Sequence, residues 1–241
     1  MFFKIRAEIL KQNKGVFYNM KIRFLRARTA IIAGIICIVT TATVAAATNG
    51  LFLTSTTDRN NAIKTFPSSD KVKSTVGFLP KYVENFEGGF KFESFNYADT
   101  SLTKDDGTSV TKSKESTFEY KRDGQKKGQY LFMNAMPLDK KYFDESIKNM
   151  KDITEYKGVK IYYNTVHRKD VPENYVKTEE DLKQIKNGTL AINVGTDKVE
   201  EYTNQSVDWY EGGIHYNITN SSYDDVSRDA MIGMAKNVIN K

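Results

Sequence analysis

The chain has 241 residues, of which 39% are apolar and 27% charged, so it has the length and composition of one or two globular domains and not of a low-complexity chain. Its net charge of +6 comes from the N-terminus, because residues 1–28 hold eight bases and one acid, which leaves 28 bases and 29 acids for residues 29–241. The main body is therefore close to neutral and lacks the basic surface that nucleic acid requires, so we expect no nucleic-acid partner.

A stretch without charged residues, Thr29–Thr57, follows the basic tail. It is long enough to cross a bilayer, which takes about 20 residues. Its small residues at 45–47 also fit the A-x-A pattern of a signal-peptide cleavage site. Two interpretations therefore stay open: a single transmembrane anchor over residues 29–53, or a secretory signal that is cleaved near Ala47.

Both interpretations give the same orientation. The basic tail of residues 1–28 stays in the cytoplasm, and the chain beyond the apolar segment lies outside. A start at Met1 favours the anchor, whereas a start at Met20 would give the short basic region of a cleaved signal. We expect a single-pass protein of the cell membrane that contacts the membrane through residues 29–53, or a secreted protein if the signal is cleaved.

The only cysteine, Cys37, lies inside the apolar segment. The part of the chain that we place outside the membrane therefore has no disulfide, no thiol nucleophile and no cysteine-based metal site. An exported domain without disulfides fits a Gram-positive bacterium better than a eukaryotic secretory pathway.

Residues 54–65 are polar and aperiodic, which is typical of a linker. Next, Ser68 and Ser69 predict the cap of a short helix that extends to Val76. Strand-like alternation of aromatic residues begins after Gly88 and changes phase near Ser94, which predicts a strand with a β-bulge.

Further turns and strands are predicted after this strand. The Asp-Gly pair at 106–107 predicts a hairpin tip, residues 121–129 a charged turn and Tyr130–Met136 a strand. A tight hairpin around Lys157–Gly158 would set Glu155 opposite Lys160.

Two helices have clear boundaries. Thr178 opens a capping box, and Leu182 and Ile185 would give this helix an apolar edge. The last helix extends from Ser227 to Ile239, and its apolar residues recur at the spacing of one helical face, which predicts core packing. Residues 66–241 thus form one α+β domain with a mainly antiparallel, twisted sheet, a C-terminal helix on one face and one N-terminal transmembrane or signal helix before it.

The segment WYEGGIHYNI holds the only Trp and one of two His residues of the chain. A two-residue turn at Gly212–Gly213 sets Trp209 opposite Tyr216 on an apolar face. The same register puts His215 on the polar face beside Asp208, where we expect a surface histidine.

The residues for catalysis are few. With only His167 and His215 available, no Ser-His-Asp site and no zinc site can be assembled from a recognisable motif. We interpret His167 as a polar loop residue. We therefore assign no catalytic, cofactor-binding or metal-binding residue and expect no cofactor.

Three stretches carry a family resemblance: VGFLPKYVENFEGGFKF, YYNTVHRKDVPENYVKTEED and VDWYEGGIHYNITNSSYDDVSRDAMIGMAKNVI. They resemble a domain of unknown function in exported and membrane-anchored proteins of spore-forming Gram-positive bacteria, over most of residues 76–240. The shared features are Trp209, Gly213-Ile214 and Tyr216 before a final helix that contains Ala235. Some members are linked to anti-sigma or cell-surface signalling proteins, so the resemblance implies sensing or binding at the envelope, although a tail of 28 residues is too short for a folded cytoplasmic domain.

The leading hypothesis is a non-catalytic extracytoplasmic domain on one membrane helix that binds or senses an envelope protein or a cell-wall component. Two alternatives stay open. One is an extracytoplasmic hydrolase that uses paired carboxylates. The other is a carrier of lipid or lipoprotein with an apolar cavity.

Overall fold

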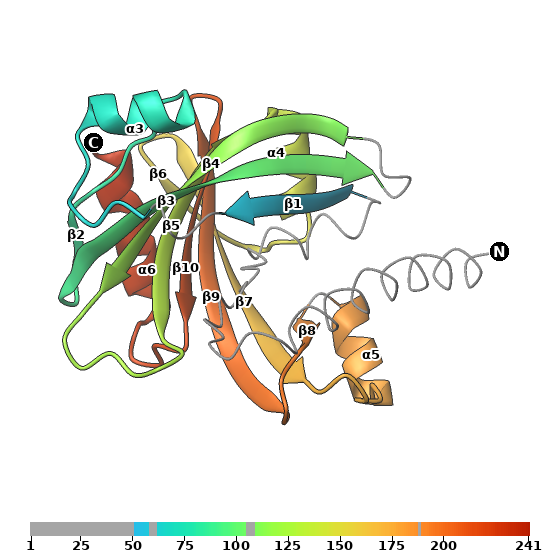
Figure 1. Cartoon of the computed structure of the whole chain (residues 1–241). Helices are drawn as coiled ribbons and strands as arrows, with labels where there is room; N and C mark the ends of the chain where they lie inside the picture. Colours follow the sequence, from blue (N-terminus) through green and yellow to red (C-terminus); the bar gives the residue numbers. More distant parts are fainter. Residues whose placement is uncertain (1–50, 58–61, 105–108, 188) are drawn as a thin grey trace, which may run out of the picture. The chain divides into compact units, whose positions relative to one another are not determined.

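A computed structural model describes residues 51–57, 62–104, 109–187 and 189–241 of the protein (Figure 1). Within these residues the chain has an α+β fold in which a mostly antiparallel sheet carries a C-terminal helix. The elements are β1 (Leu51–Thr57), α3 (Ser69–Val76), β2 (Asn85–Phe86), β3 (Phe90–Lys104), β4 (Ser109–Lys121), β5 (Tyr130–Pro137), α4 (Lys140–Ile147), β6 (Asp152–Tyr156), β7 (Val159–Val171), α5 (Glu179–Lys186), β8 (Leu190–Val194), β9 (Glu200–Glu211), β10 (Ile214–Ser221) and α6 (Arg228–Ile239).

The strand order of the sheet is β1-β3-β4-β5-β10-β9-β7-β6, with β2 beside β3 and β8 beside β7. The β7–β8 pair is parallel and every other pair is antiparallel. The last two strands of the chain, β9 and β10, thus lie in the middle of the sheet, between strands that precede them in the sequence (Figure 1).

The β9–β10 hairpin has the register that its sequence predicts, with Trp209 opposite Tyr216 and the remaining pairs in step. Gly212 and Gly213 form the turn at φ 60° and 83°. These left-handed conformations cost glycine little, because it has no Cβ atom.

One face of the sheet forms the apolar core. Trp209 and Tyr216 are fully buried there and stack with a ring-centroid distance of 5.0 Å. Helix α6 covers this face and contacts β7, β9 and β10. The predicted helical stripe is confirmed, since all of its apolar residues are buried: Met231, Met234, Ala235, Val238 and Ile239.

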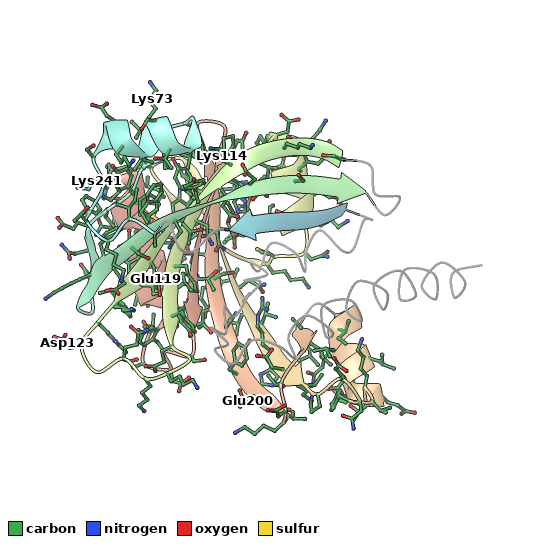
Figure 2. All side chains as sticks on the ribbon, viewed as in Figure 1. Lys73, Lys114, Glu119, Asp123, Glu200 and Lys241 are labelled. Carbon is green, nitrogen blue, oxygen red and sulfur yellow. The ribbon has the colours of Figure 1, made fainter. Side chains whose placement is uncertain are left out.

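The predicted helix caps are confirmed. Ser227 accepts a hydrogen bond from the backbone N–H of Ala230, and Ser68 accepts one from that of Lys71. Helix α3 is held to the sheet by Lys114 of β4, whose Nζ lies 3.0 Å from the backbone oxygen of Thr75. Figure 2 shows Lys114 on the sheet side of α3 and Lys73 directed away from it.

Two local strand features are also confirmed. The register of β3 against β4 shifts between Phe92 and Ser94, where the change of phase predicts a bulge. The β6–β7 hairpin turns at Lys157 and Gly158 and sets Glu155 opposite Lys160.

The start of the described chain differs from the expected linker. Residues 54–57 belong to β1, which pairs with β3, so only the later part of the 54–65 segment is left to connect elements. Their hydroxylated residues suit a strand because β-branched threonine favours extended backbone. Residues 51–53 of the predicted anchor also belong to β1, and residues 29–50 lie outside the described residues.

Two more expectations fall partly outside what the structure describes. The hairpin tip at 106–107 is not among the described residues, although β3 and β4 on either side of it pair antiparallel. In the part of the chain that is described, no helix combines the length and apolarity needed to span a membrane.

Helix α5 corrects one prediction. Its capping box forms, with Thr178 and Asp181 as the reciprocal pair. Its expected apolar edge packs only in part, because Leu182 is 55% exposed whereas Ile185 is half-buried. A polar side chain attaches α5 instead, since Asp181 is buried against Lys169 of β7.

Replacing Trp209 with alanine removes the largest buried side chain of the core and the stacking partner of Tyr216. We expect the free energy of unfolding to fall by about 3–5 kcal/mol in chemical denaturation. As a control, Val176→Ala changes a residue that is 82% exposed and should alter it by less than about 0.5 kcal/mol. Equal stabilities of the wild type and the Trp209 variant would contradict the core assignment.

Candidate functional site

The face of the sheet opposite α6 carries a row of hydrogen-bonding side chains, here called the polar row. It crosses six strands, because each member is the register partner of the next on β7, β9, β10, β5, β4 and β3. Directly opposite residues point to the same face of a sheet, so these side chains lie side by side. The members of the polar row are Tyr162, Asp208, Asn217, Asn134, Thr117 and Asn96.

Asp208 is the acceptor at the centre of a hydrogen-bond network. Its Oδ1 lies 2.9 Å from both His215 Nε2 and Asn217 Nδ2, and its Oδ2 accepts from the Ser206 hydroxyl at 3.2 Å. The Thr219 hydroxyl donates in turn to Asn217 Oδ1 at 2.7 Å. All five residues are buried, so these contacts replace water for groups that would otherwise be costly to bury.

Two amide oxygens of the polar row have no hydrogen-bond partner. Asn134 is 7% exposed, and its buried Oδ1 accepts from no donor. The Oδ1 of Asn96 is likewise buried without a partner, while its Nδ2 donates to Ser94. The two asparagines lie two strands apart, or about 10 Å. Buried acceptors without donors are rare because each forfeits the hydrogen bonds that it would make to water.

His215 is on the polar face, as its register predicts, but it is not a surface histidine. It is 6% exposed, and its ring lies 5.3 Å from that of Phe143 on α4. Helix α4 is not predicted from the sequence. Its Phe143 packs over His215 and covers this end of the polar face. A signal was present, because Phe143, Ile147 and Met150 recur at i, i+4 and i+7, but α4 has only eight residues, too few for this pattern to stand out.

Aromatic rings gather beside the network. Phe143 also contacts Tyr162 and Tyr210, with ring centroids 5.8 and 5.3 Å away. Both tyrosines belong to the polar face of β7 and β9, and the Tyr210 hydroxyl donates to the backbone oxygen of Leu138 ahead of α4. Apolar ring surfaces and hydrogen-bonding groups thus meet at one end of the polar row.

The His215–Asp208 pair contains two residue types of a catalytic triad but not its geometry, because the carboxylate lies on Nε2, the nitrogen that faces the nucleophile in a triad. A triad requires a hydroxyl or thiol on the free nitrogen of the imidazole. The hydroxyl here, that of Ser206, is bonded to the carboxylate of Asp208. Among the residues that the structure describes, no three His, Cys, Asp or Glu side chains are grouped to hold a metal ion. The side chains of the polar row offer hydrogen-bond donors and acceptors.

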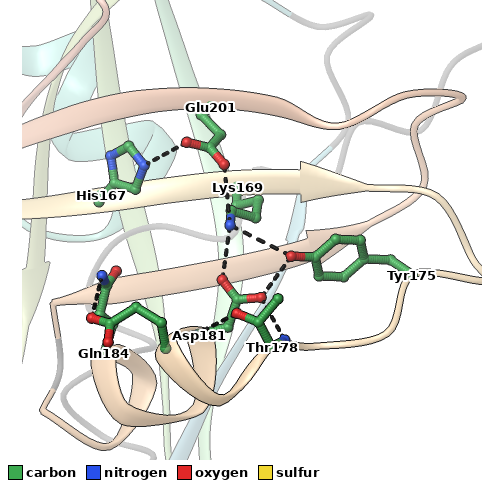
Figure 3. Close-up of polar contacts among 8 residues, drawn as sticks. His167, Lys169, Tyr175, Thr178, Asp181, Gln184 and Glu201 are labelled. Carbon is green, nitrogen blue, oxygen red and sulfur yellow. Dashed lines mark hydrogen bonds and ion pairs between the residues drawn. The ribbon is translucent and has the colours of Figure 1, made fainter.

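A second polar network attaches α5 to the sheet (Figure 3). Asp181 accepts from Lys169 at 2.8 Å, from the Tyr175 hydroxyl at 2.6 Å and from the backbone N–H of Thr178 at 2.9 Å. These donors, Lys169 foremost, hold the pKa of Asp181 well below its ordinary value. Asp181 in turn raises the pKa of Lys169 above its usual range.

His167 belongs to this second network. It was expected in a polar loop, but it lies within β7, where its Nε2 is 3.2 Å from Glu201 of β9. Lys169, followed by His167, lowers the pKa of Glu201. Strand β7 continues further than the apolar residues indicate, because it extends through Arg168, Lys169 and Asp170 to Val171.

The sequence assigns no site residue, whereas the structure places Asp208, His215 and Asn217 together with Asn134. Only the hairpin pairs of this group are visible in the sequence, because Asn134 belongs to a strand more than 70 positions earlier. No protein-family model matches the chain, and neither a curated protein nor a solved structure shows a significant match to it.

Replacing His215 with alanine leaves Asp208 Oδ1 with one donor fewer in a buried site. We expect a loss of about 1–3 kcal/mol in the free energy of unfolding, measured by urea denaturation. His167→Ala is the matched control, because that side chain is 40% exposed and its pair with Glu201 is worth about 0–1 kcal/mol. A loss no greater than that of the control would argue against a buried His215–Asp208 bond.

The attachment of α5 should weaken in acid. The folded protein holds the pKa of Asp181 below its ordinary value of 3.8. The hydrogen bonds to the Asp181 carboxylate therefore stabilise the folded state fully above pH 3.8, and this stabilisation is lost as the pH falls below 3.8 and the carboxylate is protonated. As the pH is lowered, we expect the backbone amides of α5 to lose their protection from hydrogen exchange before the backbone amides of α6 do. In Asp181→Asn the exchange of α5 should be fast already at neutral pH, and slow exchange there would contradict the role of the carboxylate.

Proposed function

We propose that the protein is a non-catalytic binding domain outside the cytoplasmic membrane, tethered through residues 29–53, and that its polar row binds a hydroxyl-rich component of the cell envelope. The observation that carries the proposal is the buried Oδ1 of Asn134, which accepts from no donor at the centre of the row. A ligand that donates a hydrogen bond there would satisfy it.

The chemistry of the row favours hydroxyl groups. Amide oxygens and a carboxylate accept hydrogen bonds, and amide nitrogens and hydroxyls donate them, whereas a ligand hydroxyl does both. Tyr162 and Tyr210 are partly exposed aromatic residues beside the row, each in contact with Phe143, and the C–H faces of a sugar can pack on the ring surface that Phe143 does not cover. Cell-wall glycan is the envelope material that combines these properties.

The composition of the row argues against a protein as the primary ligand. The centres of protein–protein interfaces are rich in aromatic residues, methionine and arginine. Here the central members are Asp208, Asn217 and Asn134, from three adjacent strands. The sensing role that the family resemblance implies is compatible with a glycan ligand.

The direct test is titration calorimetry of the full chain, in detergent, with soluble fragments of bacterial cell-wall glycan. Asn134→Leu keeps the side-chain volume and removes the unpartnered oxygen, so we expect affinity to fall about tenfold or more. The same variant should be as stable as the wild type or more stable, because a buried polar group without a partner is replaced by an apolar one.

Asn85→Leu is the matched control, because Asn85 is an exposed residue of β2 away from the polar row. It should bind the glycan as the wild type does. Equal affinity in the Asn134 and Asn85 variants would refute the polar row as the binding site. Release of shortened glycan during the titration would instead indicate a hydrolase.

A further inference from the structure

Arg168 is a buried base without an acidic partner. It lies on β7, is 5% exposed, and its Nε is buried with no hydrogen-bond partner. The other two arginines among the described residues are paired, Arg122 with Asp225 and Arg228 with Asp152. Arg168 is thus both the most buried and the only unpaired arginine in the described part of the chain.

Such an arrangement is unfavourable without a further group. Taking a guanidinium out of water costs free energy, which an ion pair and good hydrogen bonds offset. A core position could hold a methionine of similar length at no such cost. The buried, unpaired guanidinium is thus suited to bind an anion.

The surroundings of Arg168 are mixed, with Ala191 of β8 opposite it on one side, Val166 next to it on the same face of β7, and polar residues of β9 on the other side. Strand alternation places Arg168 on the same face as the polar row, opposite Tyr202 of β9. Tyr202 donates its hydroxyl to Asp170, with oxygen–oxygen distances of 3.1 and 3.3 Å. One position along the face, Asn204 is 7% exposed and its Oδ1 is also buried without a partner.

The two unpartnered groups differ in what they require. The guanidinium of Arg168 donates hydrogen bonds and attracts negative charge, whereas the amide oxygen of Asn204 accepts a hydrogen bond. A phosphate ester with a neighbouring hydroxyl supplies both, and Arg binds phosphate oxygens well because its donors form a planar fork.

We infer that Arg168 and Asn204 form a subsite for a phosphate group carried by a hydroxylated ligand. This inference rests on the proposed function in one respect, because it extends the same polar face. Arg168 is paired with Tyr202, six residues before Asp208 on β9, which is about 20 Å along a strand. Tyr202, the partner of Arg168, is two residues after Glu200, which Figure 2 labels at the start of β9. The ligand is then an extended sugar-phosphate or polyol-phosphate chain.

The test is the thermal stability of the full chain in detergent with inorganic phosphate and with glycerol phosphate, against sodium chloride at equal ionic strength. Both phosphates should raise the melting temperature of the wild type above that in chloride, because a ligand that binds the folded state stabilises it. Glycerol phosphate should act at a lower concentration than inorganic phosphate.

Arg168→Met separates this role from a structural one. The variant should melt at the same temperature as the wild type or higher without ligand, and phosphate should no longer stabilise it. Arg122→Met is the matched control: it breaks the pair with Asp225 and the stacking on Phe90 and Tyr223, so it should melt lower and keep its response to phosphate.

Arg168→Lys keeps the charge but not the fork, and its affinity for phosphate should fall about tenfold. A lower melting temperature for ligand-free Arg168→Met, or an unchanged response to phosphate, would overturn the inference. Neutral glycan binding, with its dependence on Asn134, would be unaffected by that result, so the two proposals can fail separately.

Discussion

The pairing of β9 with β10 determines which face of the sheet each central side chain occupies. The turn at Gly212 and Gly213 sets the register, and strand alternation then sends Trp209 into the core and Asp208 into the polar row. A slip of one residue would exchange the two faces, placing a carboxylate under α6 and the indole among the asparagines. The core and the candidate site therefore depend on one two-residue turn.

The features that the sequence predicts are those that neighbours in the chain determine. Helix caps, the bulge at Ser94 and the registers of both hairpins depend on residues a few positions apart, and all of them are present in the structure. The burial of His215 could not be predicted, because it depends on α4 packing over a hairpin more than 60 residues later in the chain, and the short apolar pattern of α4 does not indicate where the helix packs. The polar row depends on strands far apart in the chain, so no local pattern indicates that Asn134 meets Asn217.

The two faces of the sheet differ in the kind of group that is buried without a hydrogen-bond partner. The core consists of aromatic and aliphatic side chains that contact one another, and its groups without a partner are two donors, the Trp209 indole N–H and the Tyr223 hydroxyl. The opposite face holds amide oxygens and a guanidinium that find no partner within the described chain. Free energy gained by apolar burial in the core offsets the cost of these groups. The groups of the polar face differ from those of the core in that they are acceptors and a cation, which a hydroxylated or anionic ligand can pair with.

The central position of β9 and β10 has a consequence for biosynthesis. The chain emerges from its N-terminus, so the strands from β1 to β5 and those from β6 to β8 exist before the hairpin that joins them. Until residue 221 is available, β5 and β7 each present an unpaired edge, which is the template for association between chains. The sheet is completed when the β9–β10 hairpin pairs with β5 on one side and β7 on the other. A truncation that removes only the last strands would therefore leave two partial sheets with unpaired, aggregation-prone edges and not a smaller folded domain.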